Sequence, residues 1–175
     1  MIAGGLLRVE KIAIGAGLVL FATALLEPFL YQQLWILSII PAGLIWILVL
    51  ALATSSVISA FRDEHAELSR IRAGLAFPLA IATVLLLCGL GVPSSASAWL
   101  HLQMNLAELT ERERRAGGRP VAIDYLEGVP DGGAKIVRSR INPKRLPVAE
   151  HLRLTGERIH RCRKLTGRDW VCGYD

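Results

Sequence analysis

Two cysteines near the C-terminal end, Cys162 and Cys172, are the side chains whose chemistry the sequence defines best. They are ten residues apart, and Thr166-Gly167 between them is a turn signal that lets the chain bring them together. In an oxidising compartment such a pair forms a disulfide. Closing a loop of this length stabilises a small domain by roughly 2–3 kcal/mol. We therefore predict a Cys162–Cys172 disulfide.

Zinc binding is an alternative use of these cysteines. The ligand set would be His151, His160, Cys162 and Cys172. Its spacing matches no common zinc pattern, and residues 160 and 162 would point to different sides of a helix. Two unpaired buried thiols are the remaining alternative. Cys88 lies in an apolar stretch and is interpreted as packing, so we predict neither a metal site nor a cofactor.

Catalytic motifs do not accompany these residues. The sequence contains no glycine-rich phosphate loop, no nucleophile elbow and no metalloprotease helix. The sequence contains the residue types of a catalytic triad in His101, Asp124 and Ser139. A chain of this length contains such a set by chance, so it is no evidence for catalysis. We predict no catalytic residues and a protein that is not an enzyme.

Basic side chains surround the cysteine pair. They are His160, Arg161, Arg163, Lys164 and Arg168. The ordinary interpretation is a solvated helix end, where cations suit the helix dipole. The functional hypothesis is contact with anionic lipid headgroups or with an acidic partner surface, through Arg161, Arg163, Lys164 and Arg168. No nucleic-acid-binding motif is present, so nucleic acid is not a predicted partner.

The spacing of apolar residues predicts that residues 99–175 form a small α+β domain. Its elements, in the order helix, hairpin, helix and strand, are expected at 98–115, 121–125 with 134–141, 148–165 and 170–174. In the second helix, Val148, Leu152, Ile159 and Cys162 share one face, which we expect to lie against the core. A core of this size is thin and would benefit from a disulfide.

Three apolar stretches before this domain are each long enough to cross a bilayer, which takes about 20 residues. The predicted spans lie near residues 12–31, 34–61 and 73–92, and residues 93–98 are the predicted linker. Glu27-Pro28 marks the end of the first span, because proline disrupts helical bonding and a carboxylate is costly in lipid. The fold class is therefore a membrane protein with three transmembrane helices over residues 1–92 and an extracytoplasmic domain.

The charges in the short loops predict the orientation of these spans. Five basic residues lie before the first span or between the second and third, namely Arg8, Lys11, Arg62, Arg70 and Arg72, and none lies in residues 27–33. Positively charged loops stay in the cytoplasm. We therefore expect a cytoplasmic N-terminus and an exported C-terminal domain. The other fifteen of the twenty Lys and Arg residues do not reverse this, because long segments translocate largely regardless of charge.

The third apolar stretch also reads like an internal signal sequence. Arg70-Ile71-Arg72 precedes it, and Ala96 and Ala98 follow it as a small-residue cleavage pattern. The apolar run is longer than a usual signal core, so we expect an uncleaved span, with cleavage after Ala98 as the alternative. Both interpretations export the chain from Trp99 onward.

The combination of anchor and exported domain predicts a function class. Arginine greatly outnumbers lysine, which favours a GC-rich bacterial genome. We expect a bacterial inner-membrane accessory or scaffold subunit whose periplasmic domain binds a membrane or periplasmic protein in an envelope, secretion or conjugation assembly. The alternative is a membrane immunity or exclusion protein that blocks a toxin or an incoming element. A transporter is disfavoured because Glu27 is the only acidic residue at a span boundary and has no basic neighbour.

Overall fold

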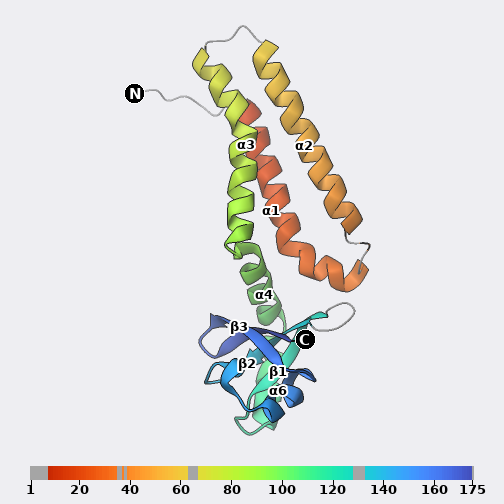
Figure 1. Ribbon diagram of the computed structural model, residues 1–175, viewed down its shortest axis with the longest axis vertical. Coiled ribbons are helices and arrows are strands. Elements are labelled where there is room, and N and C mark those ends of the chain that lie inside the picture. The colour runs from red at the N-terminus through yellow and green to blue at the C-terminus, as the bar shows by residue number, and fades with distance from the viewer. Residues whose placement is uncertain (1–7, 35–36, 38, 63–66, 128–132, 175) are drawn as a thin grey trace. The chain divides into compact units, whose positions relative to one another are not determined.

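A computed structural model describes residues 8–34, 37, 39–62, 67–127 and 133–174 of the chain (Figure 1). The elements are α1 (Arg8–Leu34), α2 (Ile39–Arg62), α3 (Glu67–Gly89), α4 (Val92–Met104), α5 (Leu106–Arg115), β1 (Val121–Glu127), β2 (Gly133–Arg138), the 3-10 helix η2 (Pro143–Arg145), α6 (Val148–Thr155), β3 (Ile159–Thr166) and β4 (Asp169–Tyr174). They divide into two compact units, Met1–Ser94 and Ser95–Asp175.

The N-terminal unit is built from α1, α2 and α3. Leu20, Val49 and Val84, one from each helix, form its buried interior. Gly17 of α1 lies close to α3, so that a Cβ at this position would be 3.5 Å from the Cβ of Ala80. A small residue at this point lets the two helices pack closely.

An ion pair joins the beginning of α1 to α3. Arg72 donates from Nε to Oε1 of Glu10 at 3.0 Å and from Nη2 to Oε2 at 3.1 Å. Along the same two helices, Gly17 then meets Ala80. The contact nearer the N-terminus of α1 is also the contact nearer the N-terminus of α3, so the two helices run parallel. The helix α2 between them in sequence runs antiparallel to both (Figure 1).

Two helices of this unit are long and apolar enough to cross a membrane, through Val9–Tyr31 and Ile39–Ile58. A third span results only if Gly74–Gly89 of α3 and the following α4 are taken together as one bent segment. The described helices therefore provide two or three candidate spans, where the sequence predicts three. The outer surface of the bundle carries large apolar side chains, among them Leu18, Leu44, Ile47, Leu48, Leu79 and Leu86.

The C-terminal unit contains a four-stranded antiparallel sheet in the order β1-β2-β4-β3. Successive side chains of a strand point to opposite faces, so each face builds its own core. One core joins α4 and α5 to the sheet and contains Ala98, Leu102, Leu109, Val121, Ile123, Tyr125 and Ile136. The other joins α6 to the opposite face and contains Val137, Leu154, Ile159 and Cys172.

The predicted helix over residues 148–165 is wrong in its second half. The helix ends at Thr155, and Gly156 follows with a left-handed φ of 85° and donates its N–H to the carbonyl of Leu152 at 2.9 Å. Strand β3 follows and pairs with β4, so the sheet has four strands. Val148 and Leu152, which we expected to face the core, are exposed.

The predicted helix over 98–115 consists of two helices. The first, α4, begins at Val92 and ends at Met104, and α5 begins at Leu106. Between them Asn105 leaves helical geometry, with φ −108° and ψ 15°. Residues 93–98, which the sequence predicts as a linker, lie in α4, where Ser97 and Ala98 are fully buried. The predicted hairpin and the last strand are confirmed as β1, β2 and β4.

Gly133 at the start of β2 offers a test of the hairpin. Its φ is 145°, and a Cβ there would lie 2.5 Å from the carbonyl oxygen of Leu126 and 2.7 Å from the hydroxyl of Tyr174. We expect Gly133→Ala to destabilise the C-terminal unit by about 1–3 kcal/mol. Gly167→Ala is the matched control, because nothing lies within 4 Å of that position. Thermal unfolding of the full chain in detergent, followed by near-ultraviolet circular dichroism, measures both; equal midpoints would contradict the expectation.

Candidate functional site

The cysteine pair lies on two neighbouring strands, directly opposite each other. Cys162 of β3 and Cys172 of β4 are register partners, their Cα atoms are 4.1 Å apart, and a disulfide joins them. Cys172 is fully buried in the core beneath α6, and Cys162 packs partly buried against that core. The disulfide therefore fixes the edge strand β3 to the interior strand β4.

The alternative zinc set is not assembled. Both of its cysteines are in the disulfide, which removes their thiolates as ligands. The Nε2 atom of buried His151 lies 2.9 Å from the carbonyl oxygen of Pro143, and His160 is exposed on β3. Among the residues that the structure describes, no three His, Cys, Asp or Glu side chains are grouped so that they could hold a metal ion.

The trio His101, Asp124 and Ser139 is not arranged as a catalytic triad. Nε2 of His101 lies 2.9 Å from the backbone oxygen of Asp124, and the carboxylate of Asp124 pairs instead with Nζ of Lys135 at 2.9 Å. Ser139 is buried, and its backbone N–H donates to the carbonyl of Arg168 at 2.8 Å. These contacts are structural.

A cavity of about 250 Å³ in the N-terminal unit includes Glu27. Apart from Thr23, Glu27 and Cys88, its lining is apolar and includes Trp46. No basic side chain lines it, so the carboxylate has no ion-pair partner among the lining residues.

The four basic residues of the predicted contact surface do not share one face. In the regular part of β3, Arg161 and Arg163 alternate with Cys162 and Lys164. Cys162 faces the α6 side, where Nζ of Lys164 lies 5.7 Å from the ring centre of Trp170. Arg161 and Arg163 therefore face the α4 side. Arg168 lies in the turn that leads to β4.

The other edge strand, β1, is closed by side chains from three helices. Arg153 of α6 donates to the carbonyl of Pro120 at 2.6 Å, and Arg112 of α5 donates to that of Ala122 at 2.8 Å. His101 of α4 lies 2.9 Å from the carbonyl of Asp124. These carbonyls belong to alternate residues and so point to the same edge. Covering them removes a template for pairing with another strand.

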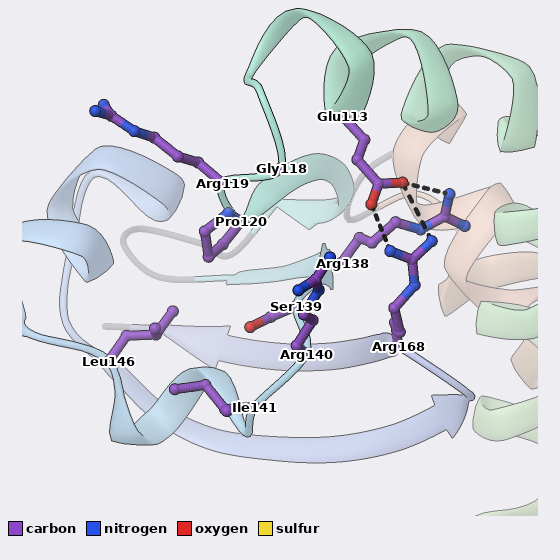
Figure 2. Close-up of a pocket in the computed structure, with 10 residues that line it drawn as sticks. All are labelled: Glu113, Gly118, Arg119, Pro120, Arg138, Ser139, Arg140, Ile141, Leu146 and Arg168. Carbon is purple, nitrogen blue, oxygen red and sulfur yellow. Dashed lines mark hydrogen bonds and ion pairs between the residues drawn. The ribbon is translucent and has the colours of Figure 1, made fainter.

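An ion-pair network connects α5 to β2 and to the turn before β4 (Figure 2). Glu113 accepts from Nη1 of Arg168 at 2.7 Å and from Nη1 of Arg138 at 3.4 Å. Arg138 also donates to Asp169, from Nε at 2.6 Å and from Nη2 at 3.2 Å. The side chains of Arg138 and Asp169 are only 10% and 9% exposed. Hydrogen bonding to Asp169 is the main reason that the pKa of Arg138 is raised.

A pocket of about 190 Å³ opens beside this network (Figure 2). Its charged lining residues are Arg119, Arg138, Arg140, Arg168 and Glu113. Figure 2 shows that Arg138 and Arg168 converge on Glu113, whereas the side chain of Arg119 extends away from them. Glu113 and Asp169 neutralise two of the four guanidinium groups, so an excess of positive charge remains, which suits an acidic group on a partner.

Arg168 is the predicted contact residue that the fold brings to this pocket, and the other three arginines have no signal in the sequence. They come from the loop before β1, from the end of β2 and from the residues after it. No protein-family model, curated protein or solved structure matches the chain. The pocket is therefore assigned from its charge and geometry.

The contribution of the disulfide can be measured directly. We expect the double variant Cys162→Ser, Cys172→Ser to lower the free energy of unfolding of the C-terminal unit by about 2–3 kcal/mol, because the ring between the two strands is lost. Cys88→Ser is the control, since Cys88 is a free, exposed cysteine. Thermal unfolding with and without reductant gives the test. A reductant that leaves the wild-type midpoint unchanged would contradict the expectation.

Asp169→Asn tests the network. The substitution keeps the size of the side chain but leaves the mostly buried Arg138 without its bidentate partner, so we expect a loss of about 3 kcal/mol. Glu111→Gln is the control, because Glu111 pairs with the exposed Arg114 and Arg115 at the surface of α5. We expect its unfolding midpoint to stay near that of the wild type. Equal urea midpoints for the two variants would rule out the buried pair as a stabilising contact.

Proposed function

We propose that this protein is a bacterial inner-membrane scaffold subunit whose periplasmic C-terminal domain binds an acidic surface of a protein partner. The observation that carries the proposal is the arginine-lined pocket, which lies in a disulfide-linked domain that follows a bundle of long apolar helices in the chain. Envelope, secretion and conjugation assemblies are the settings that suit such a subunit.

The surface of the helical bundle supports the membrane anchor. Leu18, Leu48 and Leu86, one from each helix, are all more than 60% exposed on it. So many large apolar side chains on one surface are unfavourable in water and favourable in lipid. All three helices would then cross together: α3 packs along α1, and its uncharged residues 73–89 are about 25 Å long without the help of α4, close to the thickness of the hydrocarbon layer.

The parallel arrangement of α1 and α3 supports the orientation. Their N-terminal parts lie at the same end of the bundle, joined there by Glu10 and Arg72. Arg8, Lys11 and Arg70 belong to the same parts of the sequence. By the positive-inside rule this end is cytoplasmic. The C-terminal end of α3 then lies on the outer side and leads to an exported domain.

The disulfide supports an oxidising compartment. Disulfides persist in the bacterial periplasm and are rare in the cytosol. The Cys162–Cys172 bond connects a strand of the sheet to its neighbour and half of it is fully buried, which suits a structural bond rather than a transient one. This agrees with the orientation derived from the loop charges.

The pocket supports an acidic protein partner rather than a lipid. Ile141 and Leu146 line it beside the arginines, so a partner would find apolar contacts and guanidinium groups together. Arginine beside apolar side chains is typical of the energetically important parts of protein interfaces. Arg140, which follows β2 and is exposed, is the cation best placed to meet the partner.

Reporter fusions test the orientation. Alkaline phosphatase fused after Asp175 should be active, because this enzyme folds only outside the cytoplasm, and green fluorescent protein exported from the same position by the general secretory route should be dark. Fusions within residues 63–66, between α2 and α3 in the chain, are the internal control and should behave in the opposite way. A dark phosphatase and a bright fluorescent protein at Asp175 would reverse the orientation and remove the periplasmic domain.

Charge reversal at the pocket tests the partner surface. A photoreactive amino acid at Ile141 should crosslink a protein in intact cells, and Arg140→Glu should reduce that crosslink about tenfold or more, as for an interface cation worth at least 1.4 kcal/mol. Arg158→Glu is the matched control, since Arg158 is also exposed but does not line the pocket. Equal crosslinking in the two variants would show that the pocket does not bind the partner.

A further inference from the structure

The outer face of α4 carries large apolar side chains and no charged one, although the helix belongs largely to the C-terminal unit. Its inner face presents Ala98 and Leu102 to the sheet, and both are buried. On the opposite side Trp99 and Met104 are 49% and 60% exposed, and Leu100 is 37% exposed. A helix that faces water on one side normally carries polar or charged residues there.

The neighbouring helix α5 shows what a water-facing helix of this domain looks like. It packs on the same face of the sheet through Leu109, and its exposed side carries the ion pairs of Glu108 with Arg112 and of Glu111 with Arg114. In contrast, residues 73–107, which include all of α4, contain no Asp, Glu, Lys or Arg. Two adjacent helices on one sheet face therefore carry different outer side chains.

We propose that the outer face of α4 lies in the lipid–water interface and that lipid is its partner. This inference rests on the membrane anchor proposed above. It is supported by the uncharged sequence that joins the face to α3 without interruption, and by Trp99, since tryptophan favours the headgroup level of a bilayer. A helix with apolar side chains on both sides can pack one side on the sheet and turn the other toward the acyl chains.

The sheet places basic side chains on the same side as this helix. Arg161 and Arg163 point to the face of the sheet that α4 covers, and the charge of Arg163 opposes the burial that raises the pKa of Tyr125 in the α4 core. Cations beside an interfacial helix attract anionic headgroups. Arg161 and Arg163 would then lie near lipid, and Arg168 lies at the partner pocket.

Docking of α4 would also determine which end of the domain a partner can reach. The chain enters the domain at α4 near Tyr125, whereas the pocket lies where the last turn of α5 meets the end of β2, through Glu113 and Arg138. These are opposite ends of the pair formed by α4 and α5. A domain held by α4 at the membrane surface therefore presents its arginine pocket to the aqueous compartment.

Site-directed fluorescence on the full chain tests this proposal. The Cys88→Ser protein, with its disulfide intact, is given a single new cysteine by Met104→Cys or Gln103→Cys, both exposed positions on the outer face of α4. Arg114→Cys, on exposed α5, is the matched control. Each is labelled with an environment-sensitive dye and reconstituted in vesicles of phosphatidylcholine and phosphatidylglycerol. We expect blue-shifted emission and several-fold stronger quenching by brominated lipid at the α4 positions, and stronger quenching by aqueous iodide at the control.

The outcomes separate this inference from the proposed anchor. If an alkaline carbonate wash releases the chain from the vesicles, the membrane anchor itself is wrong. If the chain is retained but the dyes at positions 103 and 104 are quenched by iodide as strongly as the dye at position 114, α4 faces water and only this inference fails. If neither brominated lipid nor iodide quenches the α4 dyes, protein covers that face, and lipid is not its partner.

Discussion

The pairing of β3 with β4 is the contact on which the C-terminal unit depends most. The Cys162–Cys172 disulfide holds the two strands in register, and the register decides which side chains of β3 face each core. The same pairing brings the turn at the end of β3 to the sheet end where Asp169 meets Arg138. Arg168 in that turn then reaches Glu113 and the pocket. The candidate partner surface is therefore a consequence of strand register.

The sequence predicts those parts of the fold that local chemistry determines. The hairpin follows from apolar residues that alternate along its two strands, and the cysteine pair follows from its spacing. The second helix is predicted too long because Val148, Leu152, Ile159 and Cys162 fit a helical period by chance, while Gly156 ends the helix after Thr155. The pocket cannot be predicted, since its arginines come from separate segments that only the folded sheet brings together.

The two edges of the sheet are protected by different means, and the difference agrees with a small core. On β1, guanidinium groups from α5 and α6 cover the carbonyls of Ala122 and Pro120. On β3, a covalent bond fixes the strand and charged side chains such as Arg161 occupy its surface. Both means limit pairing with other chains. These contacts also join helices and edge strands to the rest of the unit, whose two hydrophobic cores are small.

The charge pattern along the chain gives a physical meaning to the break at Asn105. A chain in or near lipid avoids ionised side chains, because their transfer out of water is costly. The uncharged segment continues past Pro93 to Ala107, and Glu108 on α5 is the first charged residue after it. If α4 lies at the interface as proposed, the boundary between lipid and water falls at the change from α4 to α5 rather than at Pro93. The helix then breaks where its surroundings change.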